Sequence, residues 1–118
     1  TSMGGMFYGC SSLTELDVSC FDTSNVTQMG GMFCSCEKLT VLDLHTFVTS
    51  NVTNMSVMFS GCRNLSSLNT DGFDTSNVCN MGFMFQGCKK LTAFDISCFD
   101  VSKVENYEYF MDEGKKIE

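Results

Sequence analysis

Residues 33–40 read Phe-Cys-Ser-Cys-Glu-Lys-Leu-Thr, and this stretch decides how the chain folds. The pattern Phe-x-x-Cys-x-x-Leu-Thr recurs with a period of 26 residues, with Ser66 in place of threonine in the third copy. Units repeated at 20–50 residues stack, because one unit alone cannot bury its apolar face. The columns that recur are Cys10/Cys36/Cys62/Cys88, Leu13/Leu39/Leu65/Leu91 and Phe21/Phe47/Phe73/Phe99.

Each repeat is predicted to hold one short strand and one short helix. The alternation Leu-x-Leu at Leu42 and Leu44 indicates a strand, and stacked copies would form a parallel sheet. Residues 22–25, Asp-Thr-Ser-Asn, are typical of a helix cap or a turn. The apolar residues that follow are spaced as on one face of a helix of two to three turns, and they are Val26, Met29, Met32, Phe33 and Cys36. Gly30, Gly31 and Gly82 weaken this helix. The sequence therefore predicts an α/β solenoid of about four and a half coils.

Length and charge limit the organisation and the partners. We expect residues 1–118 to form a single solenoid domain that is a fragment of a longer array, because residues 1–3 match the middle of a repeat. The net charge of −7 argues against nucleic acid as a partner. No apolar run is long enough to span a membrane. Residues 104–118 read as a degenerate terminal repeat or cap that turns charged.

The eight cysteines are expected to be free thiols rather than disulfides. Cys10, Cys36, Cys62 and Cys88 form a structural ladder whose parallel Cβ directions suit buried thiols better than bridges. A zinc site at Cys34, Cys36 and His45 is conceivable, but no ligand pair repeats. We therefore expect no metal and no cofactor.

The repeat unit closely resembles the 26-residue repeat family of bacterial surface proteins, which is related to the BspA-like leucine-rich repeats. The resemblance rests on Met32-Phe33, Leu39-Thr40, Asp43, Gly61-Cys62, residues 73–78 (Phe-Asp-Thr-Ser-Asn-Val) and Met81, and it extends from Thr1 to about Met111. It implies a right-handed leucine-rich-repeat-like solenoid on exported or lipid-anchored proteins of bacteria and some protists. Adhesion and partner binding are the functions it implies, and it supplies no catalytic residue.

A partner is expected on the outward side of the strands, because solenoids bind with the curved sheet surface. Three columns lie there: Glu15/Val41/Ser67/Ala93, Asp17/Asp43/Asn69/Asp95 and Ser19/His45/Asp71/Ser97. Carboxylates stacked at strand spacing repel one another. Hydrogen bonds from backbone amides or hydroxyls, a bridging cation, or a basic or hydroxyl-rich partner could each offset this repulsion.

The leading functional hypothesis is a non-catalytic module at the cell surface that binds a protein or glycan on a host or neighbouring cell. The alternative is a structural spacer or a polymer subunit that associates end to end. Ice binding by threonine rows is a third hypothesis, although each row carries a substitution and is interleaved with charged residues. An enzyme is not expected, because the chain has one histidine and no nucleophile–base pair outside the repeat.

Overall fold

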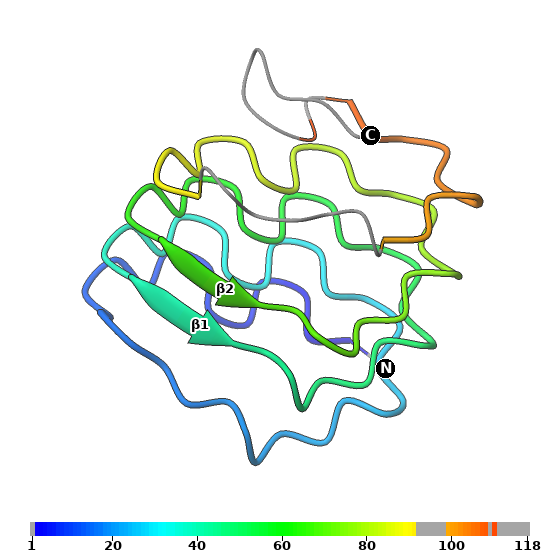
Figure 1. The fold of residues 1–118 in the computed structure, drawn as a ribbon, viewed down its shortest axis with the longest axis horizontal. Helices are drawn as coiled ribbons and strands as arrows, with labels where there is room; N and C mark the ends of the chain where they lie inside the picture. Colours follow the sequence, from blue (N-terminus) through cyan, green and yellow to red (C-terminus); the bar gives the residue numbers. More distant parts are fainter. Residues whose placement is uncertain (1, 92–98, 109, 111–118) are drawn as a thin grey trace.

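The computed structural model describes residues 2–91, 99–108 and 110 (Figure 1). Strand β1 (Val41–Asp43) pairs in parallel with strand β2 (Ser67–Asn69), so that Val41 lies opposite Ser67. Single-residue parallel bridges join other residues 26 positions apart: Ser2 and Gln28, Glu15 and Val41, Gln28 and Asn54, Asn54 and Asn80, and Asn80 and Asn106. Like residues of successive repeats therefore lie side by side. We number the repeats from residues 1–26 onward.

The predicted α/β, leucine-rich-repeat-like solenoid with a strand and a helix in every coil is wrong. Residues 2–91, 99–108 and 110 contain no helix, and their only strands are β1 and β2, each three residues long. The strand expected in the first repeat is reduced to the bridge between Glu15 and Val41. The strand expected at Phe94 and Ile96 of the fourth repeat lies outside the described residues.

Backbone hydrogen bonding explains why the expected helices are absent. We call residues 2–9, 28–35, 54–61 and 80–87 the turn ladder. In the second repeat the N–H groups of Met29 and Phe33 donate to carbonyls of the third repeat, over 2.9 Å each. Between them, Gly31 also donates to the third repeat, to the carbonyl of Ser56 over 2.8 Å, and Met32 donates only three positions back, to Met29 over 3.2 Å. An α-helix would need all these N–H groups for carbonyls four positions back in the same segment.

Backbone angles in the turn ladder also exclude a helix. Gly31, Val57 and Phe83 occupy the same position in successive repeats and have φ values of 68°, 58° and 59°. Ser35 has a φ of 62°. An α-helix requires φ near −60°, so apolar residues at helical spacing pack inward here on a chain of turns instead. The glycines at 30, 31 and 82 were the sequence signal against the helix.

The residues expected to cap helices connect repeats instead. The buried Thr49 hydroxyl donates to the carbonyl of Asp74 over 3.1 Å and accepts from the Asp74 N–H over 2.8 Å. Thr23 and Thr75 make the same pair of bonds to Val48 and Asp100. Each threonine thus satisfies both backbone groups of a residue in the next repeat.

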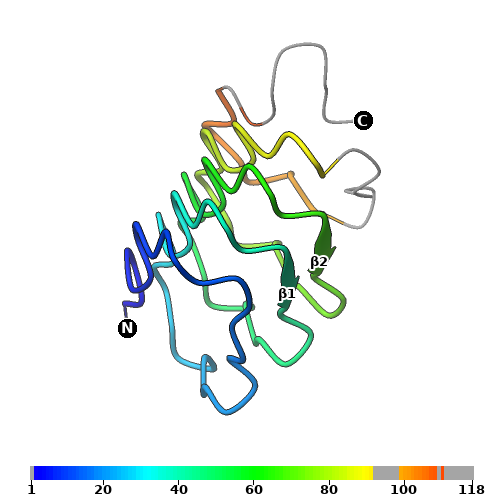
Figure 2. The same ribbon diagram turned by 90° about the vertical axis from the view of Figure 1, so that its left-hand side faces the viewer.

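The apolar core lies between the turn ladder and the strands, which occupy opposite sides of the stack in Figure 2. Phe7, Phe33, Phe59 and Phe85 stack in sequence, with ring centroids 5.4–5.7 Å apart. The methionines recur in two columns, Met3/Met29/Met55/Met81 and Met6/Met32/Met58/Met84, whose in-register spacing predicts core positions. This prediction is confirmed for six of these residues, each fully buried: Met29, Met32, Met55, Met58, Met81 and Met84.

Candidate binding face

The predicted binding columns lie on the side of the stack that carries β1 and β2. Glu15, Val41 and Ser67 are exposed, as are Asp17 and Asp43 of the middle column. In the same middle column Asn69 is half-buried, and Ser19, His45 and Asp71 of the third column are exposed. The fourth-repeat members Ala93, Asp95 and Ser97 lie outside the described residues. Every described member except Asn69 therefore offers its side chain to solvent.

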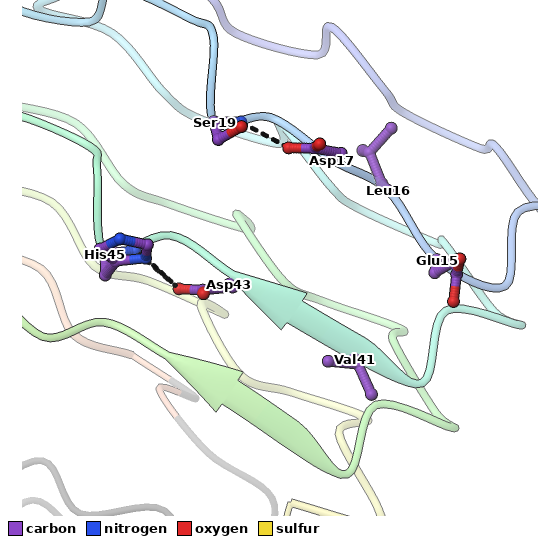
Figure 3. A pocket seen from close by; sticks show the side chains of 7 residues that line it. All are labelled: Glu15, Leu16, Asp17, Ser19, Val41, Asp43 and His45. Carbon is purple, nitrogen blue, oxygen red and sulfur yellow. Dashed lines mark hydrogen bonds and ion pairs between the residues drawn. The ribbon is translucent and has the colours of Figure 1, made fainter.

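A pocket of about 420 Å³ opens on this side between the first and second repeats (Figure 3). We call it the strand-side pocket, and it is lined by Glu15, Leu16, Asp17, Ser19, Val41, Asp43 and His45. β1 and β2 pair over three residues, whereas the first and second repeats are bridged at this face only between Glu15 and Val41. The pocket therefore lies where the pairing of successive repeats is shorter than between the second and third repeats.

The aspartates that line the pocket are held by tight local turns. An Asp17 carboxylate oxygen accepts the Ser19 N–H over 2.9 Å, and an Asp43 oxygen accepts the His45 N–H over 3.0 Å. Hydrogen bonds from the Ser19 hydroxyl, and then from its N–H, lower the pKa of Asp17. The pKa of Asp43 is lowered first by the His45 N–H and then by its side chain. Both groups therefore stay ionised, with their orientation fixed by the backbone.

The third repeat has the same turn without the charge. Asn69 accepts the Asp71 N–H through its side-chain oxygen over 2.9 Å, as Asp17 and Asp43 do in their own repeats. An asparagine thus preserves the turn, which only needs an acceptor oxygen. The backbone hydrogen bonds expected for the aspartate column are therefore present in all three described repeats.

His45 extends the pocket with a polar ring. Its Nδ1 lies 2.8 Å from a carboxylate oxygen of Asp43, and both side chains are more than half exposed, at 57% and 54% (Figure 3). An exposed pair of this kind adds little to stability. Its effect on the pocket is to hold the ring beside the carboxylate.

In the described part of the chain, no cluster of side chains is suited to bind a metal ion. Residues 2–91, 99–108 and 110 contain no group of three or more His, Cys, Asp or Glu side chains that could hold an ion. Cys34 and Cys36 are buried, whereas His45 is exposed among the residues that line the strand-side pocket.

The cysteine ladder lies inside the stack. Cys36, Cys62 and Cys88 are buried, and each thiol donates to the backbone carbonyl of Phe7, Phe33 or Phe59 in the preceding repeat, over 3.1–3.2 Å. Cys10 is half-buried, and all seven described cysteines are free. Burial raises the pKa of Cys36 to about 11 and raises that of Cys62 further. These thiols are therefore protonated at neutral pH and are poor nucleophiles.

The sequence interpretation missed a second column of acidic turns. Asp22, Asp74 and Asp100 accept the N–H of the serine two residues on, over 2.9–3.0 Å. Hydrogen bonds from the hydroxyl of that serine, and then from its N–H, lower the pKa of each carboxyl. The Asp-Thr-Ser-Asn segments that begin at Asp22 and Asp74 are predicted from the sequence to be helix caps or turns, and the acidic column itself was not singled out. The spacing Asp-x-Ser, shared with Asp17-x-Ser19, was the signal that could have identified them.

The described residues include no helix that is long and apolar enough to cross a membrane. No curated protein and no solved structure matches the chain. One family model matches residues 1–118, and the chain accordingly belongs to the family described as "Mycoplasma protein of unknown function, DUF285".

Proposed function

We propose that this chain is a non-catalytic binding module of a cell-surface protein, and that it binds a protein or glycan partner at the strand-side pocket. The observation that carries the proposal is the pair of carboxylates, Asp17 and Asp43, oriented by backbone hydrogen bonds beside an open pocket. Oriented acceptors lose little conformational freedom when they bind a cationic side chain or a sugar hydroxyl.

The charge at the pocket favours a partner with donors rather than acceptors. Glu15, Asp17 and Asp43 contribute three carboxylates, and His45 is the only lining residue that can carry a positive charge. Ser19 adds a hydroxyl at the same rim. A basic protein segment and a hydroxyl-rich glycan both fit this set, and they differ in salt dependence, because screening weakens ion pairs far more than neutral hydrogen bonds.

The proposed location at the cell surface rests on the resemblance to the 26-residue repeats of bacterial surface proteins. We propose that this family is related to those repeats, including the BspA-like group, through the shared columns of Cys, Leu, Phe and Asp-Thr-Ser-Asn. Antibody labelling of intact, unpermeabilised cells tests the location directly. Labelling that requires permeabilisation would contradict it.

Binding is tested with two defined probes, an oligolysine peptide and a panel of neutral oligosaccharides. The double variant Asp17→Asn, Asp43→Asn removes the charge but keeps an acceptor oxygen for each turn, as Asn69 does naturally. We expect about a tenfold loss of oligolysine affinity, which corresponds to about 1.4 kcal/mol. Oligosaccharide binding should change less, because the acceptor oxygens remain.

The matched control is Asp22→Asn, Asp74→Asn, which removes the same charge from turns outside the strand-side pocket. It should bind each probe within about twofold of the unmodified chain, since only long-range attraction changes. Equal losses in the two double variants would assign the effect to net charge and overturn the site. Failure to bind either probe class would overturn the proposed function.

A further inference from the structure

The strand-side pocket combines negative charge with apolar surface. The side chains of Leu16 and Val41 lie between Glu15 at one end and the two aspartates at the other (Figure 3). Val41 is 50% exposed, so a ligand in the pocket meets apolar surface that water otherwise covers. The volume of about 420 Å³ lies in the range of about 300–1,000 Å³ for sites that hold small ligands, so a whole side chain can enter it.

The outward side chains of the second repeat are exposed inside the stack and not only at its end. Val41, Asp43 and His45 have a described repeat on each side, and all three are nevertheless exposed. They point outward because they alternate with the buried Leu42 and Leu44. Stacking of repeats therefore leaves this side of the pocket accessible to a partner.

The two aspartates bring acceptor oxygens to the pocket from neighbouring repeats. Asp17 belongs to the first repeat and Asp43 to the second (Figure 3). In both, the backbone N–H two residues on donates to Oδ1, and the Nδ1 of His45 lies against the same Oδ1 of Asp43. These turns orient each carboxylate and themselves leave its second oxygen, Oδ2, to a ligand.

A guanidinium group matches this arrangement better than an ammonium group or a sugar does. Its N–H donors lie in one plane and can reach two carboxylates at once, whereas an ammonium is a compact, strongly hydrated charge. The methylene groups of an arginine side chain can also pack on Leu16 and Val41. A neutral sugar would displace water from Glu15, Asp17 and Asp43 without supplying a positive charge.

We propose that the strand-side pocket holds one arginine side chain of a protein partner, with the guanidinium between Asp17 and Asp43 and the methylene groups on Leu16 and Val41. The proposal rests on the proposed function, because it names the partner of the same site: a protein with an exposed arginine and not a glycan. Glu15, at the other end of the pocket, attracts further positive charge on that partner.

The test compares oligoarginine and oligolysine peptides of equal length and charge, whose affinities for the full 118-residue chain are measured by isothermal titration calorimetry. Oligoarginine should bind at least about fivefold more tightly. In Asp17→Asn, Asp43→Asn the two peptides should bind within about twofold of each other, because the oriented charges that favour a guanidinium are gone. The control Asp22→Asn, Asp74→Asn should keep the preference for oligoarginine, since it removes the same charge outside the pocket.

The apolar contact is tested at two valines of similar exposure. Val41→Ser should weaken oligoarginine binding about threefold. It should fold, because Ser67 occupies the same column in the third repeat. Val48→Ser, at a residue that is 45% exposed and outside the pocket, should leave the affinity unchanged. The backbone N–H signals of Ser19 and His45, which are bonded to the two carboxylates, should shift in the NMR spectrum when oligoarginine is added.

The outcomes distinguish failure of the arginine pocket from failure of the proposed function. Equal affinity for the two peptides, or a preference for oligoarginine that Asp17→Asn, Asp43→Asn retains, overturns the arginine pocket and leaves the binding module standing. Binding of neutral oligosaccharides in place of oligoarginine has the same consequence. If neither peptide and no oligosaccharide binds, both the arginine pocket and the proposed function are overturned.

Discussion

Successive repeats are joined on two sides of this molecule, the turn ladder and the strand side, and the two sides differ in how many backbone contacts join them. Between the first and second repeats the turn ladder makes backbone bonds from Met3, Gly5, Phe7 and Gly9, over 2.8–2.9 Å. On the strand side the first and second repeats share one bridged pair, Glu15 and Val41, and a pocket opens there. The difference indicates that one side holds the stack together while the other leaves polar side chains accessible to a partner.

The largest loss of stability is expected when the phenylalanine stack is truncated. Phe59 is fully buried, between Phe33 and Phe85 at 5.7 and 5.4 Å. We expect Phe59→Ala to lower the free energy of unfolding by about 3–5 kcal/mol, through lost apolar contact and a residual cavity. On the strand side, Val41→Ala at a half-exposed residue should cost less than about 0.5 kcal/mol. Urea unfolding measures both, and equal losses would contradict the division into two sides.

The next effect concerns the corner that joins the two sides. Thr49→Val keeps the shape of a side chain that is 1% exposed but leaves both the N–H and the carbonyl of Asp74 without their partner. The expected loss is about 2–3 kcal/mol, the cost of unsatisfied buried polar groups. Thr49→Ser keeps the hydroxyl and should cost about 1 kcal/mol for the missing methyl group. A valine variant as stable as the serine variant in thermal unfolding would refute this role.

A smaller change should strengthen the turn ladder. Val57 is β-branched and has a φ of 58°, a conformation in which L-residues are strained and glycine is not. We expect Val57→Gly to raise the free energy of unfolding by about 0.5–1 kcal/mol, after the entropy cost of glycine is subtracted. The reciprocal change in the same column, Gly31→Ala, should lower it by about 1 kcal/mol. Chemical denaturation measures both variants, and their free energies of unfolding can be compared if their m-values are identical. Effects of the same sign in the two variants would contradict the strain argument.

The smallest expected effect is the pH dependence of the strand side. The pKa values of Asp17 and Asp43 lie below their usual 3.8 in the folded chain. Their contribution to stability is therefore complete above about pH 4 and is lost as the pH falls through the lowered values. Asp17→Asn, Asp43→Asn keeps the turns and should flatten the loss of stability between about pH 4 and pH 2. If the unfolding midpoints of the variant and the unmodified chain fell equally with pH across this range, the loss of stability could not be assigned to Asp17 and Asp43.

The two sides also differ in how well their structure could be predicted from the sequence. The columns at Leu39, Phe47 and Met58 were assigned to the core from their spacing alone, and all three are buried. The apolar spacing of Val26, Met29, Met32 and Phe33 was assigned to a helix, and this was wrong. A turn every few residues also places side chains inward at uneven intervals, so periodicity alone does not distinguish it from a helix.

The candidate site was predictable in part. The alternation around Leu42 predicts which side chains point outward, because neighbours of a buried residue in an extended segment lie on the opposite face. The positions predicted in this way include Asp17, Asp43 and His45. The pocket does not follow from the sequence, because it depends on how far the first repeat pairs with the second. Leu16 packs against the core and also belongs to the lining of the pocket.

By itself the sequence determined the 26-residue register and the columns that are buried, because identical units pack like residue on like residue wherever they repeat. Only the tertiary structure decided where each backbone N–H finds its acceptor. In the turn ladder that acceptor is in the neighbouring repeat for Met29 and Phe33, so the segment is a series of turns and not a helix. The physical reason is that backbone hydrogen bonds between repeats compete with those inside one segment, and side-chain spacing does not report which of the two is formed.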